Sequence, residues 1–315
     1  MEKNKINYSI IIPHYNSFEK LQRLIKSIPT REDIEIIVID DKSPIEVIKD
    51  IKFLLGDKVK IMENKTIKKG AGTCRNLGLE IANGRWILFA DADDFFLKDW
   101  INEVDKYKES KFDIIYFIPT SMYEDNLKTA VRHIPYENML IKFLEKRTLK
   151  TEERIKYRFT VPWSKMIKKE LYKENNLKFD EVIASNDVMF SVKTAYNAKN
   201  IEVSEQKIYC VTTSKGSLTQ KLNKEILESR LSVAIRVNKF LKERKINKHM
   251  RSLLPHIIKS LNFELKYFFK ILKISLINGI NILEFFERYF KDIGIKNILS
   301  FRTKDRKYYV KEKTK

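Results

Sequence analysis

Residues 86–94 run Trp86-Ile87-Leu88-Phe89-Ala90-Asp91-Ala92-Asp93-Asp94, an apolar stretch that ends abruptly in a cluster of three aspartates. The apolar part predicts a buried strand. The carboxylates of Asp91 and Asp93 then follow on the turn after it. Oxygen ligands of this kind suit Mg²⁺ or Mn²⁺ shared with a diphosphate. The alternative is structural, because Asp91 or Asp94 could cap a helix that begins at Phe95.

Similar apolar runs precede this strand, with helical patterns between them. Strands are predicted at 9–13, 34–39 and 59–62, and helices at 18–28, 45–55 and 72–82. Strands that alternate with helices of this length indicate an α/β fold with a parallel sheet. Ligands collect at the carboxyl ends of such strands. Asp40 and Asp41, which close the second strand, are therefore expected near the acidic turn at 91–94.

The pattern continues less regularly after this half. A strand is predicted at 113–118, a partly helical segment at 123–157, helices at 163–175 and 187–197, and a strand at 201–212. From Lys221 the chain holds long helical stretches with almost no glycine or proline. We therefore place a boundary near residue 220, between a catalytic region and a helical C-terminal region at 221–315.

A segment of small residues, Gly70 to Asn76, leads into the helix predicted at 72–82. The positive end of that helix and the side chain of Arg75 suit a phosphate or an acceptor atom of a base. Cys74 is expected to pack as a small apolar side chain. For Asp40, contact with a nucleotide and a purely local role in the turn with Ser43 both remain open.

The 315-residue chain has a net charge of +20, with 62 Lys and Arg against 42 Asp and Glu. Residues 221–315 hold 24 of the basic and 9 of the acidic residues, so the excess lies mainly in the C-terminal third. Such a surface attracts nucleic acid, anionic lipid or a phosphorylated substrate. Two cysteines give no disulfide framework. The polar N-terminus is no signal peptide, and no uncharged apolar run reaches the roughly 18–20 residues of a spanning helix. We expect a cytoplasmic protein.

Four motifs resemble, in order and spacing, those of glycosyltransferase family 2, whose members are inverting enzymes with the GT-A fold. The motifs lie at 9–16, 38–43, 70–78 and 89–94, and the match resumes at 163–172, 178–181 and 186–190. The resemblance implies a Rossmann-like, mostly parallel central sheet flanked by helices, with a C-terminal helical extension. It also implies a nucleotide-sugar-binding part at about 1–120 and an acceptor part at about 121–220.

On the donor side the resemblance implies contacts with the nucleotide. Pro13 and Tyr15 match the loop that lies against the base. Asp40 matches the carboxylate that accepts from the base, and Asp41 beside it is a candidate for the ribose. Arg75 matches the basic residue near the base.

The resemblance also implies the residues around the diphosphate. Asp91 matches the aspartate that approaches the ribose, and Asp93 matches the metal ligand, with Asp91 as a second candidate ligand for Mn²⁺ or Mg²⁺. Lys215, in a segment at 214–219 that looks like a flexible closing loop, is a candidate partner of the diphosphate. A solvated turn is the alternative for that segment.

On the acceptor side, Asp187 matches the general base of the family. Asn186 stands before it where many relatives have Glu, so the electrostatics beside the base and the placing of the acceptor differ here. The alternative is that Asp187 or Asn186 caps the helix predicted at 187–197. Trp163 stands where relatives often place an aromatic residue near the acceptor sugar, and core packing is its alternative.

The resemblance implies transfer of a sugar from a nucleotide-diphosphate sugar, most simply a UDP-sugar, to a hydroxyl of a surface glycan. Capsule, lipopolysaccharide, exopolysaccharide and a lipid-linked oligosaccharide are the expected acceptors. The aromatic and lysine-rich helices after Phe263 suit an anionic membrane at the inner face of the cell membrane. Packing on the catalytic region or a homodimer is the alternative for them. A nucleotidyltransferase is the rival enzyme, and a basic nucleic-acid-binding protein is a weaker rival without a recognisable motif.

Overall fold

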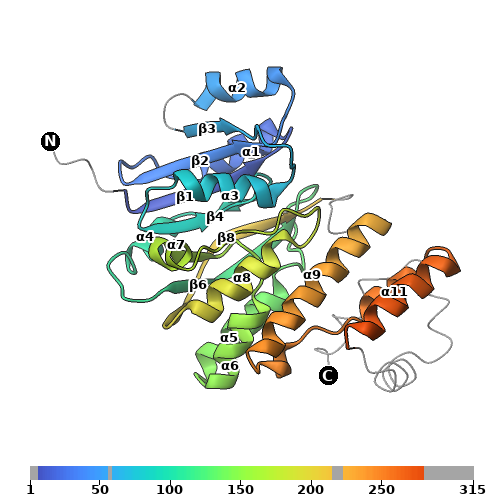
Figure 1. Ribbon diagram of the computed structural model, residues 1–315. Helices are drawn as coiled ribbons and strands as arrows, with labels where there is room; N and C mark the ends of the chain where they lie inside the picture. The colour runs from blue at the N-terminus through green and yellow to red at the C-terminus, as the bar shows by residue number, and fades with distance from the viewer. Residues whose placement is uncertain (1–5, 56–58, 215–222, 280–315) are drawn as a thin grey trace. The chain divides into compact units, whose positions relative to one another are not determined.

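A computed structural model (Figure 1) describes residues 6–55, 59–214 and 223–279 of the chain. Its centre is one eight-stranded sheet with the strand order β3-β2-β1-β4-β7-β6-β8-β5. The strands are β1 (Tyr8–His14), β2 (Ile34–Asp40), β3 (Val59–Glu63), β4 (Trp86–Phe89), β5 (Phe95–Phe96), β6 (Ile114–Tyr123), β7 (Lys165–Lys168) and β8 (Ile201–Thr213). The expected α/β class is confirmed.

The first half of the sheet, β3-β2-β1-β4, is entirely parallel. Its crossovers are α1 (Phe18–Lys26), α2 (Ile45–Leu55) and α3 (Ala71–Ile81). Helix α3 packs on β1 and β2, as Figure 1 shows. The runs of β-branched residues in β1 and β2 are buried on both faces, which explains why they are continuously apolar rather than alternating. Parallel pairing therefore brings the carboxyl ends of β1, β2 and β4 to one edge.

The second half of the sheet is mixed. Strand β7 lies between β4 and β6 and is antiparallel to both, while β6 and β8 are parallel to each other and β5 is antiparallel to β8. The prediction of one helix at 163–175 is therefore wrong in its first part. Residues 165–168 fill the gap between two strands, and helix α7 (Lys169–Glu174) begins only after them. Tertiary pairing outweighs local helical preference in this short apolar segment.

Helices cover the second half and connect its strands. They are α4 (Trp100–Asp105), α5 (Ile134–Glu145), α6 (Leu149–Arg158), α8 (Asn186–Asn197) and α9 (Lys224–Glu243). Helix α8 contacts α3, α6, α7 and α9. These contacts set the position of α8, whose first turn carries Asn186 and Asp187.

The chain divides into two compact units, 1–250 and 251–315. Helix α9 belongs to the first unit. The second contains α10 (Leu254–Ser260) and α11 (Leu265–Ile277). The functional division expected near residue 220 stays a prediction. None of the helices within the described ranges combines the length and the apolar character needed to cross a membrane.

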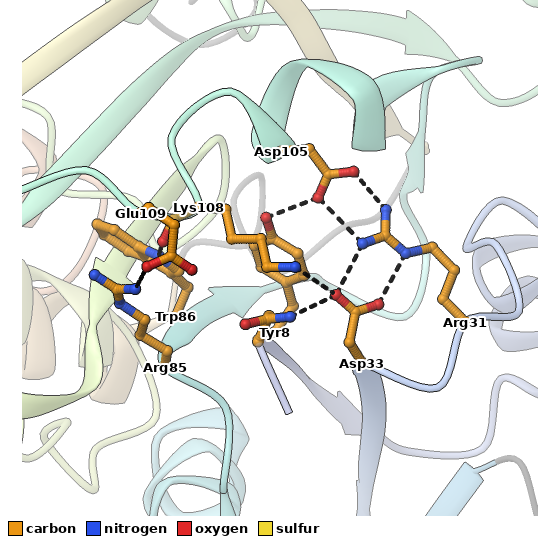
Figure 2. A network of polar contacts seen from close by, with 9 residues as sticks. Tyr8, Arg31, Asp33, Arg85, Trp86, Asp105, Lys108 and Glu109 are labelled. Carbon is orange, nitrogen blue, oxygen red and sulfur yellow. Dashed lines mark hydrogen bonds and ion pairs between the residues drawn. The ribbon is translucent and has the colours of Figure 1, made fainter. Parts of the chain in front are cut away.

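A network of polar contacts ties the chain together at the amino ends of the strands (Figure 2). Arg31 binds Asp33 through Nε at 2.9 Å and Asp105 through Nη1 at 2.6 Å. Tyr8 donates its hydroxyl to Asp105 Oδ1 at 2.9 Å. The Arg31 guanidinium holds the pKa of Asp33 at about 2, against the opposing effect of burial. The network thus fastens β1, the segment before β2 and α4 at the edge opposite the acidic residues.

Candidate active site

The carboxyl ends of β1 and β2 are held together by a buried network around Asp40. The Asp40 carboxylate accepts from Nδ1 of His14 at 2.7 Å, from Oγ of Ser43 at 2.6 Å and from the Ser43 backbone N–H at 2.8 Å. Nε2 of His14 accepts the Ser17 N–H at 3.1 Å, so its proton resides on Nδ1. Burial favours a higher pKa for Asp40, but these hydrogen bonds outweigh it and lower the pKa.

Asp40 is fully buried, whereas Asp41 is partly exposed. The Asp41 carboxylate accepts from Asn64 Nδ2 and from the Gly70 N–H, each at 2.7 Å. Gly70 has φ +114°, a conformation that favours glycine, and it leads directly into α3. Asp41 therefore joins the end of β2 to the first turn of α3 and keeps an exposed edge. Cys74 on that helix is fully buried, as expected, and burial raises its thiol pKa to about 12.

The acidic turn after β4 is braced from β8. The buried Asp94 carboxylate accepts from the Tyr209 hydroxyl at 2.9 Å and from the Thr212 N–H at 2.8 Å, while the Tyr209 oxygen accepts the Asp91 N–H at 2.8 Å. Strand β5, not a helix, begins at Phe95, so the turn does not cap a helix there. Asp94 is thus the structural member of the cluster, through hydrogen bonds to β8 and not through the helix cap considered from the sequence.

The three carboxylates of the turn lie close enough to influence one another, with Asp94 buried and Asp91 and Asp93 partly buried. Burial, then the charge of Asp91, raises the pKa of Asp93, and burial with both neighbours raises that of Asp94 well above its usual range. The backbone N–H of Asp93 lowers the pKa of its own carboxyl in part, and among the described residues no side-chain hydrogen bond to this carboxylate is found. A divalent cation would relieve this crowding of negative charge, so Asp93 fits the expected ligand. Within the described ranges, no group of three or more His, Cys, Asp or Glu side chains could by itself hold a metal ion.

Arg75 of α3 connects the acidic turn to the head of α8. Its guanidinium donates to Asp91 Oδ1 at 2.5 Å and to Asn186 Oδ1 at 2.8 Å, and its Cζ lies 5.4 Å from the centre of the Phe179 ring. The side chain is buried, so these charge-assisted contacts are shielded from water. Arg75, predicted near the base, therefore lies between Asp91 and Asn186.

Asp187 is the second residue of α8, and neither it nor Asn186 caps that helix. The N-cap is Ser185, in a left-handed conformation with φ +62° and without a side-chain cap hydrogen bond. Burial, then the charge of Asp91, raises the pKa of Asp187, while Arg75 and Lys165 act in the opposite direction. A carboxylate with a raised pKa at the edge of an acidic site has the properties of a general base.

The segment before α8 is fixed from two sides. On one side a Cβ added to Gly72 of α3 would lie 2.2 Å from the Asp180 carbonyl oxygen, so only glycine fits there without movement. On the other side Ser229 of α9 donates to the Ala184 carbonyl at 2.9 Å, and Arg236 pairs with Asp180 at 3.0 Å. Helix α9 therefore supports the segment that presents Asp187.

The other predicted site residues lie in three different situations. Tyr15 is 58 % exposed and Pro13 is half-buried at the end of β1, both next to the Asp40 network. Trp163 is 1 % exposed and stacks on Tyr209 with 6.3 Å between ring centres, which favours its packing role. Lys215 lies outside the described residues.

The fold and the site together define an α/β protein. Its acidic residues lie at the carboxyl ends of the parallel strands, where such folds bind nucleotides, and Asp187 approaches them from helix α8. The family model described as glycosyl transferase family 2 matches residues 9–175, which is more than half of the sequence. The chain belongs to glycosyltransferase family 2, and the resemblance found in its motifs is confirmed.

Curated relatives extend this finding. Poly(ribitol-phosphate) beta-N-acetylglucosaminyltransferase TarS of Staphylococcus aureus is 25 % identical over 216 residues, which cover 67 % of this chain and 36 % of TarS. Poly(ribitol-phosphate) beta-glucosyltransferase of Bacillus spizizenii is 29 % identical over 64 % of this chain and 31 % of its own length. An uncharacterized glycosyltransferase of Methanocaldococcus jannaschii is 30 % identical over 65 % of this chain and 70 % of its own. The chain spans about a third of the length of the first two.

Solved structures agree on the fold. The crystal structure of S. aureus TarS 1–349 in complex with UDP-GlcNAc superposes with a TM-score of 0.61 at 21 % identity, covering 95 % of this chain and 76 % of that one. At this identity the likeness shows the fold alone. It confirms the GT-A-like arrangement of sheet and helices.

Proposed function

We propose that this protein is an inverting glycosyltransferase that moves a sugar from a UDP-sugar to a hydroxyl of a growing surface glycan. The single observation that carries the proposal is the Arg75 bridge. One guanidinium binds both Asp91, on the acidic turn, and Asn186, at the head of α8. The donor-side carboxylates and Asp187 therefore face one another across the span of one side chain.

In this proposal Asp187 removes the proton from the acceptor hydroxyl. The oxygen of that hydroxyl attacks the anomeric carbon from the face opposite the diphosphate, and the bond from that carbon to the diphosphate oxygen breaks. One displacement inverts the anomeric configuration. The ionised form of Asp187 is the active one, so its raised pKa makes it a stronger base than an ordinary aspartate.

Asp93 is the candidate ligand for Mn²⁺ or Mg²⁺, because among the described residues no side chain pairs with its carboxylate, whereas Asp91 pairs with Arg75 and Asp94 with Tyr209. A bound divalent cation would offset the negative charge on the leaving diphosphate. Asp91 is already paired with Arg75, which fits a residue that orients the donor more than one that holds the cation.

At the base, Asp41 is a better candidate than Asp40 for direct contact with the nucleotide. Both carboxylate oxygens of the fully buried Asp40 accept hydrogen bonds from His14 or Ser43, whereas Asp41 keeps an exposed edge. Asp40 then acts by fixing the loop at Tyr15. Lys215 remains the candidate partner of the diphosphate, and Trp163 and Asn186 remain candidates on the acceptor side.

The acceptor is proposed to be a capsule, lipopolysaccharide, exopolysaccharide or lipid-linked glycan. The names of two relatives add poly(ribitol-phosphate) to the acceptors worth testing. Attachment to the inner face of the membrane is supported by α11, where Leu265, Phe269 and Ile277 are exposed beside three exposed lysines. A homodimer through the C-terminal helices is the competing use of the same surface.

A thermal-shift series tests the donor. UDP-, GDP- and dTDP-sugars are compared with and without Mn²⁺, since a ligand at one hundred times its Kd stabilises by about 2.7 kcal/mol. We expect stabilisation by a UDP-sugar that increases with Mn²⁺ and is lost in Asp93→Asn. Equal, metal-independent shifts for all nucleotides would contradict the proposed donor site.

A further inference from the structure

Lys165, the first residue of β7, is a buried lysine that the proposed reaction does not use. Its side chain is 3 % exposed. Nζ lies 3.1 Å from Ser191 Oγ, and 5.9 Å and 5.7 Å from the ring centres of Tyr116 and Phe159. An ammonium group has three hydrogen-bond donors. Burying it beside one side-chain acceptor and two aromatic rings therefore costs free energy of folding. Structural packing alone would be served better by an apolar side chain.

The contact with Ser191 holds Lys165 against α8, the helix whose first turn carries Asp187. The Ser191 hydroxyl donates to the Thr160 carbonyl at 3.1 Å, so its oxygen can only accept from Lys165 Nζ. Ser191 is four residues after Asp187, one turn along the same face of the helix. The lysine is therefore held one helical turn from the base, on the face of α8 that carries Asp187.

The backbone before Lys165 is strained in a way that fits this role. Ser164 adopts φ +53°, which is uncommon for a residue other than glycine. It is 3 % exposed, and no described residue partners its hydroxyl. A non-glycine residue in the left-handed region is destabilising and persists only where the surroundings impose it. The conformation of Ser164 directs the side chain of Lys165 into the protein interior.

The charges around Asp187 come from three directions. Arg75 of α3 and Lys165 of β7 stabilise its ionised form, whereas Asp91 on the turn after β4 and burial oppose it. Arg75 is already bound to Asp91 and Asn186. Lys165 has Asp187 as its electrostatic partner, and burial lowers the lysine pKa to about 7.

We propose that Lys165 is a positioning residue, whose buried ammonium keeps Asp187 ionised so that it can act as the base. The proposal rests on the proposed function of Asp187. In it, Lys165 touches neither donor nor acceptor. Its effect is electrostatic and reaches the substrate only through the carboxylate.

The test compares Lys165→Met with Lys168→Met, the same substitution three residues along the same strand. Lys168 is half-buried, and its Nζ lies 3.5 Å from the Ser110 carbonyl oxygen and 5.7 Å from the centre of the Trp86 ring. Turnover with a UDP-sugar is measured from pH 5 to 9. In Lys165→Met the acidic limb of the kcat/KM profile moves to higher pH by about one unit, because loss of a nearby positive charge raises the pKa of a carboxylate. On the acidic limb kcat falls by up to about tenfold, which is the full effect of a shift of one unit, while KM for the donor changes less than twofold. Lys168→Met should change neither the pH profile nor kcat.

A second measurement needs no turnover. In ¹³C-aspartate-labelled protein, the carboxyl resonance lost in Asp187→Asn identifies Asp187, and its titration should move to higher pH in Lys165→Met. An unchanged titration overturns the proposal. Absence of turnover in the unmodified protein would contradict the proposed function alone, since the titration still decides the role of Lys165.

A third variant covers the case in which Lys165→Met does not fold. Ser191→Ala keeps the charge but removes the acceptor that holds it against α8. We expect the titration of Asp187 to move in the same direction by a smaller amount. If Ser191→Ala leaves that titration in place, the proposal is overturned.

Discussion

Asp187 lies in the first turn of α8, close to Arg75 and the acidic turn. Burial raises its pKa. Replacing it with Asn removes the proton acceptor without changing its shape. We expect Asp187→Asn to lower kcat about 10²–10⁴-fold, as for other general bases, while the affinity for UDP stays within twofold. Turnover and isothermal titration with UDP give the two numbers. Asp50→Asn, on the exposed side of α2, should change neither, and full turnover in Asp187→Asn would contradict its role.

Tyr209 serves two partners with one hydroxyl, donating to Asp94 and accepting from the Asp91 N–H. Tyr209→Phe leaves two buried polar groups without that partner. An unsatisfied buried group costs about 1–3 kcal/mol, so the midpoint of thermal unfolding should fall by several degrees. Binding of UDP with Mn²⁺ should weaken as well, because the turn loses its brace. Tyr196→Phe, at an exposed position on α8, is the control and should leave both properties unchanged.

Among the elements, α3 and the segment before α8 approach so closely that Gly72 has no room for a side chain. The Cβ of Gly72→Ala would meet the Asp180 carbonyl at 2.2 Å and Asn186 Cβ at 3.0 Å. We expect the segment to move away and kcat/KM to fall at least tenfold in protein that remains folded.

Gly78→Ala provides the matched comparison for this prediction. It lies on the same helix, but its Cβ would meet the Ile11 side chain in the core at 2.4 Å. It should lower the thermal midpoint while the folded protein keeps its activity. Loss of activity in Gly78→Ala but not in Gly72→Ala would contradict the assignment of the site.

The same elements show how far the sequence predicts the structure. Strands β1, β2 and β4 are evident as apolar runs because parallel strands buried on both faces need no alternation. Strand β7 was taken for part of a helix, since its four residues receive their conformation from the neighbours β4 and β6. The brace from Tyr209 to Asp94 joins residues 115 positions apart, and nothing local to either one indicates it. The family motifs predict roles for Asp187 and Asp93 that stay predictions, while the contacts of Asp40 with Ser43 match the local turn role left open from the sequence.

For the molecule as a whole, stability should depend on pH through the network of Figure 2. Asp33 has a pKa of about 2, below the roughly 3.9 of an unfolded aspartate. A lowered pKa stabilises the folded state above pH 4, and that contribution is lost as pH falls toward 2. Asp33→Asn should therefore lower the free energy of unfolding at pH 7 by about 1 kcal/mol after solvent screening.

Urea unfolding at pH 7 and at pH 3 measures this contribution. The gap between Asp33→Asn and the unmodified protein should narrow at pH 3, because Asp33 begins to protonate in the unfolded chain. A gap that stays constant or widens on acidification would show that the Arg31–Asp33 pair contributes no linked stability. Catalysis should be unaffected at pH 7, because the network lies at the edge of the sheet opposite the acidic turn.

The contacts of Ser229 and Arg236 with the segment before α8 affect which fragments of such enzymes can be expected to keep the site intact. The family match ends at residue 175, twelve residues before Asp187 and 49 before the start of α9, the helix that holds its segment in place. A fragment trimmed to the matched span would retain the acidic turn and lose its counterpart. Under the proposed function, we expect such a fragment to bind the nucleotide without catalysing transfer. Comparisons of specificity among relatives of this chain should therefore extend through α9, because the family match ends before this helix.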